Sequence, residues 1–96
     1  MQTLFEWDGQ KAETNLRKHG VSFEEAQTIF TDSLAITLAD PDHSEDEDRF
    51  IDIGMSGNQR VLVVSYTQRG QTIRLITARR ATPGELRRYE GEGNYG

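Results

Sequence analysis

The stretch RVLVVSYTQRGQTIRLITARR, residues 60–80, decides the fold of this 96-residue chain. The apolar run 61–64 lies in a predicted strand at 60–67, and Gln68-Arg69-Gly70 is a turn signal. Residues 72–79 then alternate between the two faces of a predicted strand. One face carries Ile73, Leu75 and Thr77, and the other carries Arg74, Ile76 and Ala78. Two such runs joined by a short turn predict an antiparallel β-hairpin.

The residues before this hairpin extend the sheet. Residues 49–56 alternate and end at Gly57-Asn58, another turn signal, so they predict a strand antiparallel to the one at 60–67. The segments 34–39 and 4–7 predict two further strands. The run 40–48 is rich in charge and predicts a loop.

Helix-start signals stand outside the strands: Asp8, Ser22 with Glu25, and Thr82 with Pro83 and Glu85. They predict a helix from Asp8 to about His19, ended by Gly20, a second from 22 to about 30, and a last one from 82 through 89. The order β-α-α-β-β-β-β-α indicates an α+β fold, with an antiparallel sheet of about four to five strands flanked by two N-terminal helices and one C-terminal helix. We expect one domain at 1–90 and a flexible C-terminal tail at 91–96.

Composition narrows the class of protein. The chain has no cysteine, which excludes disulfide scaffolds, thiolate zinc sites and cysteine nucleophiles. No stretch reaches the roughly 20 apolar residues of a membrane span, and the N-terminal residues do not resemble a signal peptide. We therefore expect a small cytoplasmic domain without membrane association.

The charge is divided unevenly along the chain. The net charge is −5, but residues 1–48 hold 3 basic and 12 acidic residues (−9), whereas residues 49–96 hold 8 and 4 (+4). All 8 basic residues of the second half are arginines, which contact phosphates with two parallel hydrogen bonds. The overall balance argues against non-specific binding of nucleic acid, while the second half can still carry a local anion site.

Helical spacing brings Lys11, Asn15, Lys18 and His19 together near one face of the first helix. Such a cluster could hold a phosphate, and histidine can transfer protons near neutral pH. The alternative is that the lysines are solvated and that His19 caps the helix end, where its charge suits the dipole. The spacing alone favours this alternative.

A second candidate is a set of arginines, namely Arg69, Arg74, Arg79, Arg80, Arg87 and Arg88. Two guanidinium groups near the start of the last helix could form an anion site. Consecutive strand residues point to opposite faces, so Arg79 and Arg80 cannot share one site if the strand continues through Arg80. The alternative is ordinary surface charge.

The charged loop is a third candidate, because it holds Asp40, Asp42, His43, Glu45 and Glu47, which are possible metal ligands. Its spacing does not match an EF-hand loop, and a solvated acidic loop is the favoured interpretation, so we predict no metal site. Tyr89 lies in the basic C-terminal segment, where a phenol could stack on a base or donate a proton.

Taken together, these short blocks resemble the BrnT family, the toxin half of a bacterial type II toxin–antitoxin pair. The blocks are FEWD at 5–8, KHGVSFEEA at 18–26, VLVV at 61–64 and IRLITARRAT at 73–82, together with Lys11, Asn15, Arg49, Arg69, Glu85 and Tyr89. The resemblance implies a RelE-like fold and a ribonuclease that halts translation without a cofactor. It also implies a BrnA-type antitoxin with a ribbon-helix-helix domain, through which alone the complex would contact DNA and repress its operon.

The resemblance also suggests roles for individual residues. RNA cleavage in such folds uses the ribose 2′-hydroxyl as nucleophile, so the protein must move protons and stabilise charge on the phosphate. We predict that Lys18, Arg69 and Arg79 hold the phosphate and that His19 or Glu47 transfers protons. The residues predicted to bind RNA are Lys11, Asn15, Arg74, Arg80 and Tyr89.

The acidic balance of the chain, with a pI near 4.9, is unusual for a protein that approaches RNA. It keeps open a second hypothesis, a non-catalytic module that binds the antitoxin and acts in autoregulation of the operon.

Overall fold

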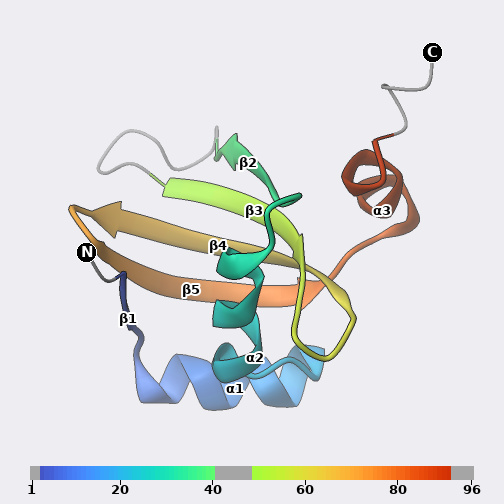
Figure 1. Cartoon of the computed structure of the whole chain (residues 1–96). Helices are drawn as coiled ribbons and strands as arrows, with labels where there is room; N and C mark the ends of the chain where they lie inside the picture. The colour runs from blue at the N-terminus through green and yellow to red at the C-terminus, as the bar shows by residue number, and fades with distance from the viewer. Residues whose placement is uncertain (1–2, 41–48, 92–96) are drawn as a thin grey trace.

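The fold is built on a five-stranded sheet (Figure 1). A computed structural model describes residues 3–40 and 49–91. The strands are β1 (Leu4–Glu6), β2 (Ile36–Ala39), β3 (Arg49–Met55), β4 (Val61–Arg69) and β5 (Thr72–Arg80), in the spatial order β1-β5-β4-β3-β2. This confirms the α+β class, the number of strands and the hairpin that the sequence predicted. The proposed tail at 91–96 lies, apart from Gly91, outside the described residues.

The sheet is mixed, which differs from the fully antiparallel sheet that we expected. The pairs β2–β3, β3–β4 and β4–β5 are antiparallel, but β1 lies parallel to β5, with Phe5 opposite Ile73. Short turns join β3 to β4 and β4 to β5, which favours antiparallel pairing. No turn joins β1 to β5, and the long intervening chain permits a parallel alignment.

The helices form where the caps predict them. The Asp8 carboxylate accepts hydrogen bonds from the N–H groups of Gln10 and Lys11 at the start of α1 (Gly9–His19), which ends at Gly20 with φ of 70°. The last helix, α3 (Pro83–Tyr89), begins with the complete capping box of Thr82 and Glu85. The second predicted helix is shorter than expected, since α2 (Phe23–Gln27) passes into the 3₁₀ turn η1 (Thr28–Thr31).

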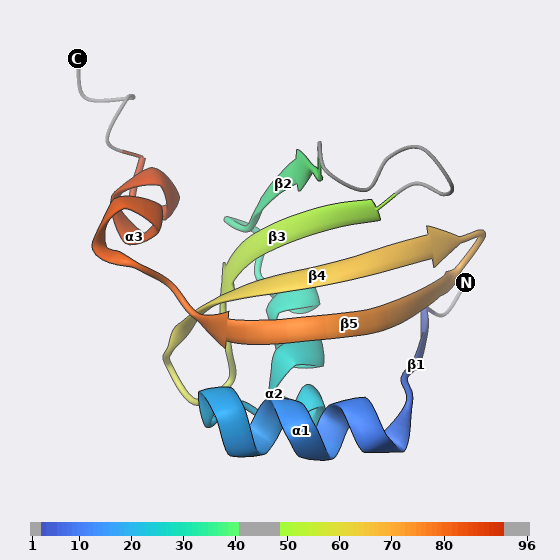
Figure 2. The ribbon, with the colours of Figure 1, turned by 180° about the vertical axis from the view of Figure 1, so that it is seen from behind.

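The core lies between the sheet and the helices that cover one of its faces. Val21, Phe23, Ala26 and Ile29 pack there against apolar side chains of β4 and β5, and all four are completely buried. Figure 2 shows the opposite face, over which α1 and α2 do not pass and beside which α3 stands at one end. No helix in the described residues is long and apolar enough to cross a membrane.

A β-bulge interrupts the alternation of β5. Arg74, Thr77 and Arg79 pair with Thr67, Ser65 and Val63 in turn, so the register shifts by one residue at Ile76. The alternation predicted for β5 is therefore wrong beyond Leu75, because Ala78 faces the core and Thr77 faces away from it. A bulge adds one residue to one strand of a pair, and hydrophobic alternation alone does not reveal where it falls. Its consequence is that Arg74 and Arg79 lie on the same face although they are five positions apart.

Candidate functional site

The face of the sheet opposite the core carries a group of basic and hydroxyl side chains, and we call it the open face. The strand register places six polar residues there, namely Arg49 of β3, Ser65 and Thr67 of β4, and Arg74, Thr77 and Arg79 of β5. Ile51, Ile53 and Val63 lie on the same face, and Ile53 and Val63 are buried. Two strands thus present three arginines on one surface. Because guanidinium groups bind phosphate oxygens in pairs, this surface is suited to a polyanion.

Arg79 is held by a forked ion pair at one end of the open face. Its Nη1 and Nη2 each donate to one carboxylate oxygen of Glu85, both at 2.8 Å. The same carboxylate accepts from the Thr82 N–H in the capping box of α3. The hydrogen bonds from Arg79, partly opposed by burial, lower the pKa of Glu85 to about 2. The pair therefore orients Arg79 and fixes α3 against β5.

Tyr89 makes a second connection between α3 and the rest of the fold. Its hydroxyl donates to Asp32 Oδ2 at 2.6 Å, and the same oxygen accepts from the Met55 N–H at 2.8 Å. Burial and the hydrogen bond to Asp32 raise the pKa of Tyr89 to about 12. A phenol engaged in this way is a weak proton donor at neutral pH, so the geometry points to a role in holding α3 more than to the predicted contact with a base.

Asn15 occupies a buried position between α1 and β5. It is 5% exposed, and its Nδ2 donates to the carbonyls of Val21 at 2.9 Å and Ala78 at 2.8 Å. Its Oδ1 accepts from the Ala78 N–H at 3.0 Å. The side chain thus pairs with the edge of β5 beyond the end of β1, as a neighbouring strand would. The prediction that Asn15 contacts RNA disagrees with this position, because its donors and acceptor are already used inside the fold.

The remaining predicted residues of α1 lie beside a groove of about 700 Å³ along the helix. Lys11 and Lys18 are exposed and His19 is half-buried in the last turn, and Ile76 and Thr77 of β5 complete the groove. Lys11 belongs to the first turn of α1, whereas Lys18 and His19 end it near the part of β5 that Asn15 holds. Lys18 and His19 therefore lie toward the same end of the molecule as Arg79.

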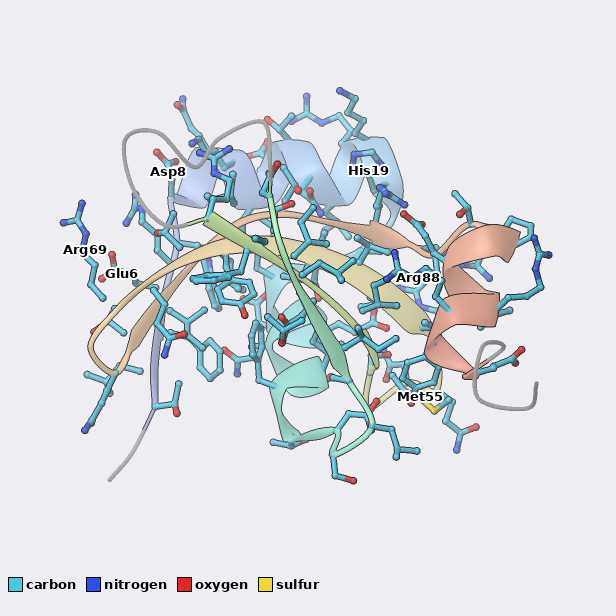
Figure 3. The ribbon with its side chains drawn as sticks, turned by 90° about the horizontal axis from the view of Figure 1, so that it is seen from above. Glu6, Asp8, His19, Met55, Arg69 and Arg88 are labelled. Carbon is cyan, nitrogen blue, oxygen red and sulfur yellow. The ribbon has the colours of Figure 1, made fainter. Side chains whose placement is uncertain are left out.

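Arg69 and Arg74 lie at the other end of the sheet. They line a groove of about 290 Å³ together with Glu6, Thr67 and Thr72. Arg69 and Val63, the partner of Arg79, are six residues apart on β4, which corresponds to about 20 Å at the usual rise of a strand. Figure 3 shows this division, with Glu6 and Arg69 at one end and His19 and Arg88 at the other.

The predicted phosphate-binding set is therefore not brought together as one cluster. Arg69 is too far from Arg79 to share a phosphate with it. β5 continues through Arg80, so Arg79 and Arg80 point to opposite faces, as the sequence analysis anticipated for that case. Glu47, with the other residues of the charged loop at 41–48, lies outside the described residues.

Sequence reasoning missed the carboxylates that organise this surface. Glu85 was recognised as a cap, but its pairing with Arg79 depends on how α3 turns back toward the sheet. Asp32 bonds to Tyr89, 57 residues away in the sequence, and Glu6 bonds to Arg74, 68 residues away. Local spacing in the sequence does not predict such contacts. Arg49 was quoted in the resemblance only, although it lies beside Thr67 on the open face. Within residues 3–40 and 49–91, no group of three His, Asp or Glu residues is placed to hold a metal ion.

Comparison with known proteins identifies the fold and the family. The model of the family described as "Ribonuclease toxin, BrnT, of type II toxin-antitoxin system" matches residues 7–85. The fold is similar to the crystal structure of the Brucella abortus ribonuclease toxin BrnT, with a TM-score of 0.64 and 21% sequence identity, over 85% of this chain and 99% of that one. No curated protein matches the chain.

The family match spans most of the chain, from Trp7 at the end of β1 to Glu85 in α3, and so includes Arg79 and both grooves except Glu6. Toxins of type II systems are paired with a protein antitoxin, so an antitoxin partner follows from this membership. The chain belongs to the BrnT family of ribonuclease toxins from type II toxin–antitoxin systems.

Proposed function

We propose that this protein is an endoribonuclease that cleaves RNA in the cytoplasm without a metal ion and thereby inhibits translation. In the reaction, the ribose 2′-oxygen attacks the adjacent phosphorus and loses its proton to a base. The bond from phosphorus to the 5′-oxygen breaks, and that oxygen receives a proton. The products are a 2′,3′-cyclic phosphate and a 5′-hydroxyl, so the protein supplies only proton transfer and stabilisation of charge.

The observation that carries this proposal is the position of Arg79 on the open face. Its guanidinium is oriented by Glu85, and such a preorganised cation lowers the cost of the extra charge on the phosphate in the transition state. Lys18 lies toward the same end of the molecule and adds a second cation. A phosphate at Arg79 competes with Glu85 for the same nitrogen atoms, so the ion pair also tunes how readily Arg79 binds substrate.

His19 is the proton carrier that we propose among the described residues. Imidazole both accepts and donates protons near neutral pH, and it lies in the last turn of α1, toward the Arg79 end. Glu47 remains the alternative proton carrier. Lys11, Arg69, Arg74 and Arg80 then contact RNA away from the reacting phosphate.

The partner that we propose is a BrnA-type antitoxin with a ribbon-helix-helix domain. Family membership supports an antitoxin, and the small core of a 96-residue chain would gain stability from such an interface. In this scheme the antitoxin supplies the contacts to DNA through which the complex represses its operon. The toxin contacts DNA only indirectly.

The test is cleavage of RNA by the purified, antitoxin-free protein in EDTA, with the variants Arg79→Ala and Glu85→Gln. Arg79→Ala removes both the ion pair and the cation, whereas Glu85→Gln removes the ion pair and keeps the cation. We expect Arg79→Ala to lose about 100-fold or more in kcat, the scale found for removing one group that stabilises a transition-state oxyanion. Glu85→Gln should lose less activity than Arg79→Ala, because the cation remains although the carboxylate that orients it is gone.

Thermal unfolding of both variants provides the control, because each loses the contact between β5 and α3. Equal losses of activity in the two variants would mean that Arg79 acts only by holding α3. Folded wild-type protein that cleaves neither free RNA nor RNA on ribosomes would favour the alternative, a non-catalytic module that binds the antitoxin.

A further inference from the structure

The groove at the β1 end of the open face has its own arrangement of charges. Glu6, Arg74, Thr67 and Arg49 follow one another in a row across β1, β5, β4 and β3. Thr72 and Arg69 form the next row, beside the turn at Gly70. Among the described residues, three arginines and one glutamate thus lie around two threonines at this end of the sheet.

Arg74 is held there by a weak contact. Its Nη1 donates to Glu6 Oε2 at 2.9 Å, and the two side chains are 48% and 52% exposed. Such an exposed pair contributes little net free energy, because water and salt screen it. Its partner can therefore be exchanged for another anion at small cost.

Two residues at or beside the groove have buried polar groups. Thr67 lines the groove but is only 4% exposed. Arg49, beside Thr67, has an Nε that is buried without a hydrogen-bond partner. Burial of a guanidinium whose donors are not all satisfied costs free energy, and a nearby phosphate would reduce that cost.

We infer that this groove binds one phosphate of the RNA strand away from the cleaved phosphate, and that Glu6 yields Arg74 to it. The inference rests on the proposed function. Thr67 and Val63, the β4 partners of Arg74 and Arg79, are four residues apart, or about 13 Å along the strand. A strand of RNA must extend by several nucleotides to reach from one arginine to the other, so the groove selects for substrate length without reading bases.

The test measures binding of a non-cleavable 2′-O-methyl single-stranded RNA of about twelve nucleotides, a length in the range of single-strand binding sites, against a dinucleotide. The variants are Arg74→Gln and Glu6→Gln. Glu13→Gln is the matched control, because Glu13 pairs with Arg17 at 2.7 Å on exposed α1 and its loss changes the net charge equally. Fluorescence anisotropy over a range of salt concentrations gives the affinity and its salt dependence.

We expect Arg74→Gln to weaken binding of the long RNA by about fivefold and to reduce its salt slope by about 0.7, the value for one phosphate contact on a single strand. Glu6→Gln should tighten binding of the long RNA more than Glu13→Gln does. Binding of the dinucleotide should be unchanged in Arg74→Gln. Thermal unfolding checks that each variant is folded.

Two results would overturn the inference. One is equal tightening by Glu6→Gln and Glu13→Gln, which would mean that net charge alone matters. The other is an equal effect of Arg74→Gln on long and short RNA. Neither result depends on cleavage. If the protein binds RNA but does not cleave it, the proposed ribonuclease activity is wrong, and the binding data still decide this inference.

Discussion

Two arginine–glutamate pairs lie on the same face of β5 and differ in almost every physical respect. Arg79 meets Glu85 through two hydrogen bonds, and the side chains are 40% and 26% exposed. Arg74 meets Glu6 through one, with about half of each side chain in solvent. Glu85 also caps a helix, whereas Glu6 belongs to a three-residue edge strand.

The difference separates an arginine that is fixed from one that can exchange its partner. A forked, partly desolvated pair sets the direction of the guanidinium, which suits a group that must meet charge developing in a transition state. A single exposed pair holds its arginine loosely, which suits a contact that an RNA backbone replaces. The bulge at Ile76 places both on one surface, and bulges commonly re-aim side chains in this way.

The largest effect should come from Asn15, which fixes the part of β5 that carries Arg79 and leaves the Arg74 end untouched. Asn15→Ala would leave the buried N–H and C=O of Ala78 and the C=O of Val21 without this partner. We expect a loss of about 3 kcal/mol in the free energy of unfolding, since each buried unsatisfied group costs about 1–3 kcal/mol. Chemical denaturation measures it.

Hydrogen exchange sharpens the same prediction. The Ala78 amide should exchange faster in Asn15→Ala, whereas the amides of residues 72–74, which β1 covers, should change only as global stability does. A loss below 1 kcal/mol would show that water replaces the asparagine amide and that β5 does not depend on it.

Replacing Arg79 or Arg74 by lysine should change different kinetic constants of the reaction. Lysine keeps the charge but cannot make the two parallel hydrogen bonds of the Arg79 pair. We expect Arg79→Lys to lower kcat by about tenfold or more, within the range for weakened oxyanion stabilisation. Arg74→Lys should change kcat by less than about twofold and act on KM, because a point charge still serves a backbone phosphate. Similar losses of kcat in both variants would contradict distinct roles.

Protonation of Glu85 at low pH should break its ion pair with Arg79. The pKa of Glu85 is about 2 in the folded protein against an ordinary value of 4.5, so protonation is resisted by the fold. A lowered folded pKa stabilises the protein fully above pH 4.5, and this stabilisation is lost as the pH falls toward 2. The stability difference between wild type and Glu85→Gln should therefore shrink over that range.

Thermal unfolding of both proteins between pH 7 and pH 2.5 measures this difference. Subtraction removes other groups, such as Asp52, whose pKa burial raises, and Glu25, whose pKa the hydrogen bond from Arg60 lowers. A difference that stayed constant with pH would show that the carboxylate contributes nothing as a charge.

The sequence predicted those parts of the fold that local rules govern. The Asp8, Ser22 and Thr82 caps, together with the turn at Gly70, depend on a few adjacent residues, and the structure has them where the pattern indicates. The bulge was missed because Ile76 and Thr77 both suit a strand, and the choice of which one is extra depends on packing of Leu75 and Ala78.

The candidate site was predicted in its residue types and not in its arrangement. Arginines on β5 and a histidine ending α1 could be found from spacing. Whether Arg69 lies near Arg79 depends on the length of the hairpin, which separates residues close to its turn from those at its base. Asn15 was assigned to the surface because its place on α1 matches the lysines, and only the edge of β5 makes it a buried partner.

Tyr89→Phe should give the smallest change, and it decides whether the Arg79 end is held by one contact or by two. The variant loses the hydrogen bond to Asp32, and we expect about 1 kcal/mol less stability, the usual net contribution of one hydrogen bond. Burial alone would raise the pKa of Asp32, but the hydrogen bonds from Met55, Tyr89 and Leu34 lower it, so two donors remain in the variant. Cleavage should stay within about twofold of wild type, because Glu85 continues to orient Arg79. A loss of about 100-fold in kcat with normal thermal unfolding would instead make the Tyr89 hydroxyl a proton donor in the reaction.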